Sequence, residues 1–266
     1  MATRVLLDID GVLVVSWQPL PGAVEVVEWL RGQGIGTLLA TNTSSRTRAQ
    51  IADLLARTGF AIGPDQVLTA VTSARDYLVD RHRGVECLVV NDGDLRDDLE
   101  DVRVVGADNA GRAGVVLLGG YGPGIGYAEL DAAFKLAVEG VPVVALHRNT
   151  RFQTVDGPAL DMGAFILGLE AAAGIEIPVV GKPSLDFFSS ALDRLDRLGA
   201  PAGETVMVGD DIGSDVLGAQ AVGITGVLVR TGKFRPSDLE GTAGQPDHVI
   251  DDISRLPDLL CQLERH

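Results

Sequence analysis

Residues 6–15 read LLDIDGVLVV, an apolar run that is interrupted by two carboxylates. Asp8 and Asp10 stand at the end of what otherwise reads as a buried β-strand, and Gly11 behind them permits a turn. Two like charges about 4 Å apart repel by roughly 4 kcal/mol at an effective dielectric constant near 20. A strand that ends in this way needs a cation nearby to offset the repulsion.

The rest of the chain alternates short apolar runs with segments of helical periodicity. The runs that predict buried strands are residues 4–10, 35–42, 65–71, 86–92, 102–108, 113–121, 141–147, 177–184, 204–211 and 224–232. The segments that predict helices are residues 21–34, 45–60, 127–140, 163–174, 184–199 and 214–223, with a further helix that begins near Thr72. Such alternation is typical of a mostly parallel α/β sheet with helices on both faces.

Composition limits the classes of partner. The chain has 266 residues, enough for one large or two modest domains, and a net charge of −15. An acidic surface argues against binding to nucleic acid or to an anionic membrane, although a local cation can still hold a small anion. Cys87 and Cys261 have no metal-like spacing and predict reduced thiols in a cytoplasmic protein. Asp8 interrupts the N-terminal apolar run, so no signal peptide or membrane span is expected there.

Ligands on parallel sheets bind at the carboxyl ends of the strands, so the strand ends are the informative positions. Asp8 and Asp10 end one predicted strand and Asp210 ends another. One such aspartate would most simply be a helix cap or a turn residue. Three converging carboxylates without histidine or cysteine instead favour Mg²⁺ over zinc.

Two further strand ends predict an anion site. Thr41 and Asn42 end an apolar run and precede a helix, where a hydroxyl, an amide and backbone N–H groups can bind an anion or simply cap the helix. Lys182 also lies between a strand and a helix, and it is one of only three lysines in the chain. A lysine there indicates a need for a compact point charge, although most lysines lie on surface turns.

Taken together, these blocks resemble the motifs of the haloacid dehalogenase superfamily of phosphatases. They match in the family's order and span nearly the whole chain. The matching residues are Asp8-Ile9-Asp10-Gly11-Val12, Thr41 with Asn42 beside it, Lys182, and Gly209-Asp210-Asp211 followed by Asp215.

The position of the longest insertion refines the resemblance. Only about thirty residues separate Asp10 from Thr41, whereas a long segment with its own strands and helices lies between Asn42 and Lys182. This is similar to the branch with a large α/β cap, which includes the p-nitrophenyl and pyridoxal phosphatases. The resemblance implies a Rossmann-like parallel core over residues 1–77 and 179–266, with an inserted smaller α/β cap over residues 78–178.

The resemblance also implies a role for each motif residue. Asp8 would be the nucleophile and Asp10 the general acid and base. Mg²⁺ would be held by Asp8, the backbone carbonyl of Asp10 and Asp210, and Thr41, Asn42 and Lys182 would hold the phosphoryl oxygens. Asp211 or Asp215 would orient Lys182 or a metal-bound water, with Asp215 favoured for the lysine.

The sequence therefore predicts a Mg²⁺-dependent phosphatase for a small phosphorylated substrate: a phosphomonoester, a phosphoramidate or pyrophosphate. The alternatives are a non-catalytic regulatory protein on the same scaffold and a phosphotransferase. Relatives often pair through the cap, so a homodimer is expected. Candidate substrate contacts in the cap are His147, Arg148, Asn149 and residues 156–161.

Overall fold

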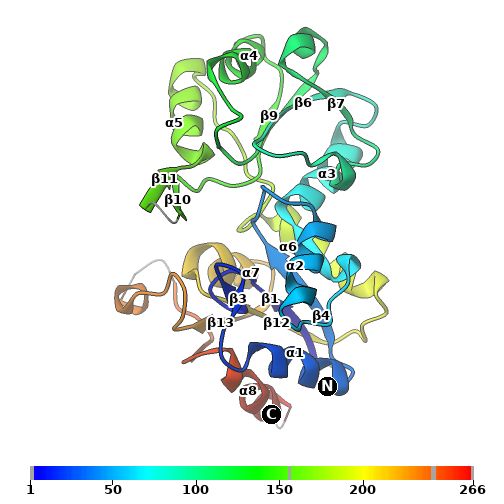
Figure 1. Cartoon of the computed structure of the whole chain (residues 1–266), viewed down its shortest axis with the longest axis vertical. Coiled ribbons are helices and arrows are strands. Elements are labelled where there is room, and N and C mark those ends of the chain that lie inside the picture. The colour runs from blue at the N-terminus through cyan, green and yellow to red at the C-terminus, as the bar shows by residue number, and fades with distance from the viewer. Residues whose placement is uncertain (1–2, 155–156, 241–243, 265–266) are drawn as a thin grey trace. The chain divides into compact units, whose positions relative to one another are not determined.

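The computed structural model describes residues 3–154, 157–240 and 244–264, and the chain forms two compact units (Figure 1). Unit 1 comprises residues 1–41, 48–68 and 182–266, and unit 2 comprises residues 42–47 and 69–181. Each unit has its own sheet and helices, which confirms the predicted α/β class. The predicted cap, residues 78–178, lies within the sequence of unit 2, and its role as a cap stays a prediction.

Unit 1 is built on a six-stranded sheet in which the central strand β1 pairs in parallel with both β12 and β4. The register places Leu7 opposite both Val208 and Leu39, so the three strands end at one edge. In spatial order the strands are β14 (His248–Ile250), β13 (Thr225–Val229), β12 (Glu204–Gly209), β1 (Thr3–Leu7), β4 (Gly36–Thr41) and β5 (Val67–Thr69).

Alternating side chains of β1 bury the two faces of this sheet. Val5 and Leu7 pack into one apolar cluster with three helices: α1 (Ala23–Gly32), α2 (Arg48–Arg57) and α8 (Leu256–Leu263). Leu6 packs into the opposite cluster with α6 (Leu185–Arg197) and α7 (Gly218–Gln220). A strand buried on both faces explains why the run around Asp8 is continuously apolar.

Unit 2 contains a four-stranded parallel sheet in the order β7 (Arg103–Val105), β6 (Glu86–Val90), β8 (Val115–Leu118) and β9 (Val143–Ala145). Helix α3 (Ala70–Arg81) packs on one face. Helices α4 (Tyr127–Val138) and α5 (Met162–Ala173) pack on the other face. An antiparallel hairpin, β10 (Arg151–Thr154) and β11 (Gly157–Leu160), precedes α5.

Two predicted elements are different in the structure. Residues 177–184 form no strand, and only Val179 makes a bridge, to Ala145. Pro178 lacks an N–H and cannot support a full ladder. The predicted helix at 214–223 shortens to α7, because residues 212–217 wind more widely, with the Val216 N–H reaching back to the Asp211 carbonyl (3.4 Å).

The sequence patterns also missed several short or terminal elements. These are α8, β14, the hairpin β10–β11 and a second hairpin, β2 (Val14–Val15) with β3 (Gln18–Pro19). Strands of two to four residues carry too few positions for a period of two to be visible.

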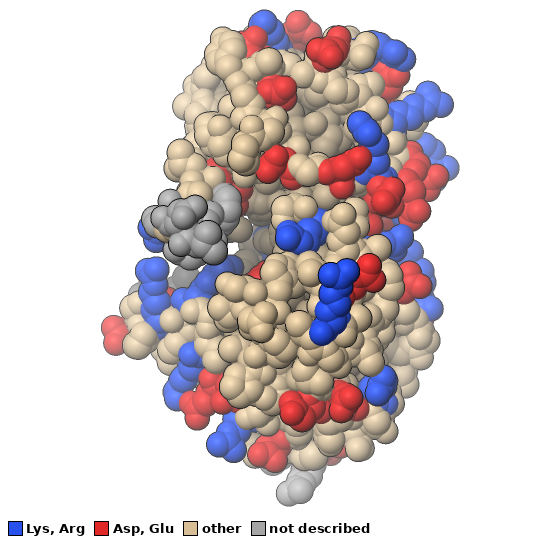
Figure 2. Space-filling model, viewed as in Figure 1, with Lys and Arg blue, Asp and Glu red and all other residues tan. Residues whose placement is uncertain are grey.

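The surface is mixed in charge where Figure 2 shows it. Acidic and basic side chains are interspersed over the visible face of each unit. Within the ranges that the structure describes, no helix is both long enough and apolar enough to cross a bilayer. The expected absence of nucleic-acid and membrane partners stays a prediction.

Candidate active site

The parallel pairing of β1 and β12 brings two aspartates to one sheet edge. Asp8 directly follows β1, and its backbone N–H donates to the Val208 carbonyl of β12 (2.9 Å). Asp210 directly follows the end of β12. Both carboxylates are buried, with relative exposures of 5% and 1%. Two buried like charges at one edge require compensation by cations.

Lys182 supplies the first compensating charge. Its Nζ lies 2.7 Å from Asp8 Oδ1 and 2.7 Å from Asp215 Oδ1, and it donates to the Ala40 carbonyl (2.8 Å). These three oxygens match the three N–H donors of an ammonium group. Burial disfavours the charged lysine, but the carboxylates of Asp215 and Asp8 outweigh it and raise the pKa of Lys182. The buried lysine is therefore charged at neutral pH.

Asp210 has one satisfied and one unsatisfied oxygen. Its Oδ2 accepts the backbone N–H of Lys233 (2.7 Å). Its Oδ1 is the one buried side-chain polar atom without a hydrogen-bond partner in the part of the chain that the structure describes. Burial, and then the charge of Asp8, raise the pKa of Asp210 to about 7. An orphaned carboxylate oxygen of this kind indicates a ligand that the chain itself does not provide.

The donors around Asp210 suit a divalent cation. Asp8, Asp210 and Asp215 each offer an oxygen, and these oxygens lie within 4.8 Å of one another. The group contains only hard carboxylate ligands, as Mg²⁺ or Ca²⁺ prefers. Both oxygens of Asp215 are engaged, Oδ1 by Lys182 (2.7 Å) and Oδ2 by the Asp211 N–H (3.2 Å), so Asp8 and Asp210 are the pair that fits an ion best. Asp10 is exposed, and its carboxylate is not part of this group.

The other predicted residues occupy distinct positions. Thr41 is the last residue of β4 and is buried. Asn42 belongs to unit 2, where a Cβ added to Gly181 would lie 2.7 Å from its Oδ1. Asp211 accepts the N–H groups of Gly213 and Ser214 (both 3.0 Å), which lower its pKa although burial opposes the shift. Asp211 therefore caps the turn after β12, and Asp215 is the residue in contact with Lys182.

Comparison with known proteins agrees with this geometry. A family model described as haloacid dehalogenase-like hydrolase matches residues 5–104, and a related hydrolase model matches residues 179–256. A phospholysine phosphohistidine inorganic pyrophosphate phosphatase from Bos taurus is 35% identical over 265 residues, which is 97% of this chain and 94% of the relative. The chain belongs to the haloacid dehalogenase-like hydrolase family.

Solved structures extend the likeness of this hydrolase to three dimensions. A p-nitrophenyl phosphatase from Archaeoglobus fulgidus superposes with a TM-score of 0.86 at 27% identity, covering 97% of this chain and 98% of that one. A glycerol phosphate phosphatase from Mycobacterium tuberculosis, solved in complex with magnesium, gives 0.84 at 25% identity and covers 96% of this chain and 76% of that one. The chain is accordingly a hydrolase that acts on phosphate bonds.

Sequence reasoning missed the contribution of a further strand end, that of β13, to the site of this hydrolase. Residues 231–233 follow β13, and this turn contacts Asp210 through the N–H of Lys233 and the Gly11 carbonyl through the Thr231 hydroxyl (2.5 Å). The available signal was the rarity of lysine, since Lys233 is one of only three in the chain.

Three of the candidate substrate contacts have partners within unit 2, and their role in substrate binding stays a prediction. His147 is buried with its Nε2 3.2 Å from the Ser44 hydroxyl, and Arg148 forms an ion pair with Glu170 (2.7 Å). Asp161 caps α5. Asp156 lies outside the described residues.

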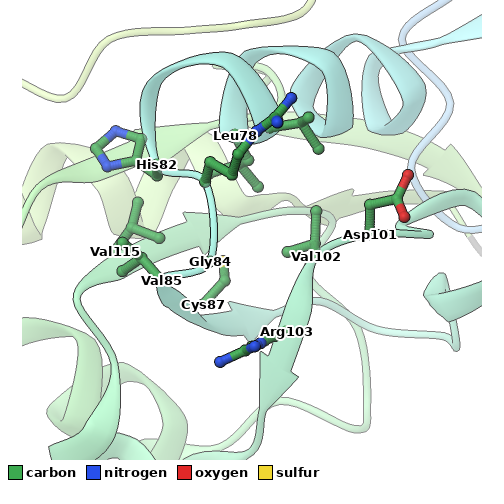
Figure 3. A pocket seen from close by; sticks show the side chains of 11 residues that line it. Leu78, His82, Gly84, Val85, Cys87, Asp101, Val102, Arg103 and Val115 are labelled. Carbon is green, nitrogen blue, oxygen red and sulfur yellow. The ribbon is translucent and has the colours of Figure 1, made fainter.

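A cavity of about 400 Å³ in unit 2 does not contain the chemistry described above (Figure 3). It opens between the end of α3 and the amino ends of β6 and β8, where Leu78, Val85, Val102 and Val115 give it apolar walls. The carboxylates that suit a cation lie instead at the carboxyl edge of the sheet of unit 1.

Proposed function

We propose that this hydrolase is a Mg²⁺-dependent phosphatase that removes a phosphoryl group from a small substrate through an aspartyl-phosphate on Asp8. The observation that carries the proposal is the buried contact of Asp8 with Lys182 beside the unpartnered Oδ1 of Asp210. It supports the proposal because a buried carboxylate, a fixed ammonium group and a carboxylate oxygen without a partner lie at one sheet edge. The magnesium complex of the Mycobacterium tuberculosis relative supports the choice of metal.

Each residue of the site then has a chemical task. Asp8 attacks phosphorus while the bond to the leaving group breaks, which produces the aspartyl-phosphate. Asp10 is exposed. It protonates the leaving group and later takes the proton of the water that hydrolyses the intermediate. Lys182 stabilises the negative charge of the phosphoryl oxygens, and Asp215 holds Lys182 in position. Thr41 and Asn42 donate to the same oxygens.

A bound Mg²⁺, held by Asp8, the Asp10 carbonyl and Asp210, would neutralise charge on the transferred group. The orphaned Oδ1 of Asp210 and the oxygen-only donor set fit that ion. We further propose that residues 78–178 act as a cap that selects the leaving group.

The relatives support a small phosphorylated substrate. The name of the Bos taurus relative includes phospholysine, phosphohistidine and inorganic pyrophosphate. We propose that this chain acts on a compound of this range, and a panel of these substrates with phosphomonoesters would identify the best one.

The deciding experiment uses p-nitrophenyl phosphate with and without Mg²⁺. The wild type should release phosphate only with the metal, and Asp8→Asn should lose at least about 10³-fold in kcat, because the nucleophile is removed. Asp53→Asn, which changes an exposed aspartate of α2, is the matched control and should match the wild type.

Three results separate the alternatives. Equal turnover by Asp8→Asn and the wild type would contradict the assignment of the nucleophile. Phosphate release that requires an added acceptor would indicate a phosphotransferase. No release from any member of the panel would favour a non-catalytic binding protein.

A further inference from the structure

The turn at residues 231–233 connects three strand ends of unit 1. It follows β13, its Thr231 hydroxyl donates to the Gly11 carbonyl (2.5 Å), and its Lys233 N–H donates to Asp210 Oδ2 (2.7 Å). Gly11 follows β1 and Asp210 follows β12. The turn therefore contacts both segments that carry the proposed metal ligands.

Two glycines make this close approach sterically possible. Gly11 has φ +86° and Gly232 has φ +61°, and a Cβ on either would lie 2.0 Å from Asp210 Oδ2. A Cβ on Gly232 would also lie 2.7 Å from the Gly11 Cα. The Asp210 carboxylate thus lies between two glycine backbones, in a space that no side chain could share.

The two oxygens of Asp210 consequently differ. Oδ2 is fixed by the Lys233 N–H and by the two glycines, whereas Oδ1 is buried without a partner. Partners of this kind, outside the ligand shell, typically change metal affinity by about 10- to 100-fold when they are removed. We propose that the 231–233 turn is a positioning element that holds Asp210 by Oδ2 and so presents Oδ1 to the metal. This inference rests on the proposed magnesium site.

The side chain of Lys233 affects Mg²⁺ binding in the opposite direction from its backbone N–H. Its Nζ lies 3.8 Å from Asp211 Oδ2, and 60% of the side chain is exposed. Its positive charge also interacts with Asp210 and Asp8, the carboxylates that would bind the cation, and therefore repels that cation. The backbone N–H therefore favours Mg²⁺ binding, and the ammonium group of the same residue weakens it.

The test is direct titration of the metal-free full-length chain with MgCl₂ by calorimetry, without substrate. Gly232→Ala displaces the Asp210 carboxylate and should weaken Mg²⁺ binding about tenfold. Gly34→Ala is the matched control, because Gly34 also has positive φ (+69°) but has no atoms within 4 Å of an added Cβ. Its Kd for Mg²⁺ should stay within about twofold of the wild-type value, since it introduces the same backbone strain away from the carboxylate.

Lys233→Met keeps the N–H but removes the charge, so it should tighten Mg²⁺ binding about fivefold at low salt and less at high salt. Lys233→Arg restores the charge and should return Kd to within about twofold of the wild type. A general loss of structure would weaken Mg²⁺ binding in both variants. It would not raise Kd in Gly232→Ala and lower Kd in Lys233→Met.

Folding of each variant is checked by thermal unfolding without metal. If Gly232→Ala does not fold, Thr231→Val takes its place, because it removes only the hydroxyl donated to Gly11 and should weaken binding about threefold. The inference would be overturned if Gly34→Ala and the variant of the turn had equal Kd values for Mg²⁺. It would also be overturned if Lys233→Met shifted Kd in the same direction as Gly232→Ala. A wild type that binds Mg²⁺ with unaffected variants overturns only this inference, and a wild type that does not bind overturns the proposed metal dependence as well.

Discussion

The two sheets of this hydrolase end in polar clusters of different kinds. At the carboxyl edge of unit 1, Asp8, Asp210 and Asp215 gather, two of them pair with Lys182, and Oδ1 of Asp210 has no partner. In unit 2, His147 follows β9, with Ser44 on its Nε2 and the Asn149 N–H on its Nδ1 (3.3 Å). The first cluster has excess negative charge and an open ligand position, whereas the second is hydrogen-bonded within itself.

The difference shows that a parallel sheet edge is not by itself a catalytic site. Both edges gather side chains from loops far apart in the sequence, as the topology requires. Among the described residues, the edge of unit 1 is the one that holds a buried carboxylate oxygen without a hydrogen-bond partner. The comparison leads to four predictions.

The largest expected effect comes from Asp210→Asn, which removes the charge of the unpartnered carboxylate. Mg²⁺-dependent hydrolysis of p-nitrophenyl phosphate at a fixed metal concentration should fall about 10³-fold, more than the loss typical for groups outside the ligand shell. Asp161→Asn, which changes a buried carboxylate of unit 2, is the matched control and should remain within about threefold of the wild type. Comparable losses in both variants would remove the distinction between the two edges.

Lys182→Met should cause the next largest effect, on stability. It leaves Asp8 facing Asp215 in a buried site, and breaking a buried ion pair typically costs about 3–5 kcal/mol of unfolding free energy. Arg148→Met in unit 2 breaks a more exposed pair with Glu170, which is worth about 1 kcal/mol or less. Urea unfolding of both variants without metal measures the two values, and similar losses would contradict the contrast.

The pH dependence of metal binding should be specific to unit 1. The pKa of Asp210 is raised to about 7, so the folded, metal-free chain holds a proton there that the unfolded chain loses near pH 4. This group therefore lowers the stability of the metal-free chain as pH rises from about 4 to 7. Mg²⁺ competes with that proton, so the rise in Tm produced by Mg²⁺ should be small at pH 6 and should increase through pH 7.

Thermal unfolding at several pH values, with and without MgCl₂, measures this dependence. In Asp210→Asn, MgCl₂ should raise Tm only slightly at every pH. If MgCl₂ raised the Tm of the wild type equally at pH 6 and pH 8, Asp210 would not be the group whose proton competes with Mg²⁺.

The smallest effect is expected for Ser44→Ala in unit 2. It removes the oxygen beside His147 Nε2 and should cost about 1 kcal/mol of unfolding free energy, the usual value for one hydrogen bond. Hydrolysis of p-nitrophenyl phosphate at saturating Mg²⁺ should change much less than for Asp210→Asn. A loss of activity as large as that of Asp210→Asn would instead place the cluster of unit 2 in the reaction.

Much of the site in unit 1 was readable from the sequence because its residues terminate apolar strands. Asp8, Thr41 and Asp210 follow runs that are buried on both sheet faces, so their position at one edge follows from parallel pairing. The family resemblance predicted that Asp215 orients Lys182, and the structure shows these two side chains in contact. The proposed roles in catalysis remain predictions.

What the sequence did not reveal depends on contacts between distant loops. The hydrogen bond of the Lys233 N–H involves a backbone atom, which no residue pattern records. Residues 212–217, which include Asp215, wind more widely than an α-helix, whereas the periodicity of 214–223 predicted an ordinary helix. His147 reads as an isolated histidine, and only the fold brings Ser44 beside it.

The strand order of unit 1 has a consequence for synthesis on the ribosome. Strands β1, β4 and β5 emerge first and are neighbours in the sheet, whereas β12 begins only at Glu204, after all of unit 2 has been translated. At usual elongation rates the open side of β1 waits on the order of ten seconds for its partner. During that interval the nascent chain presents an unpaired apolar edge, which is where a chaperone would be needed.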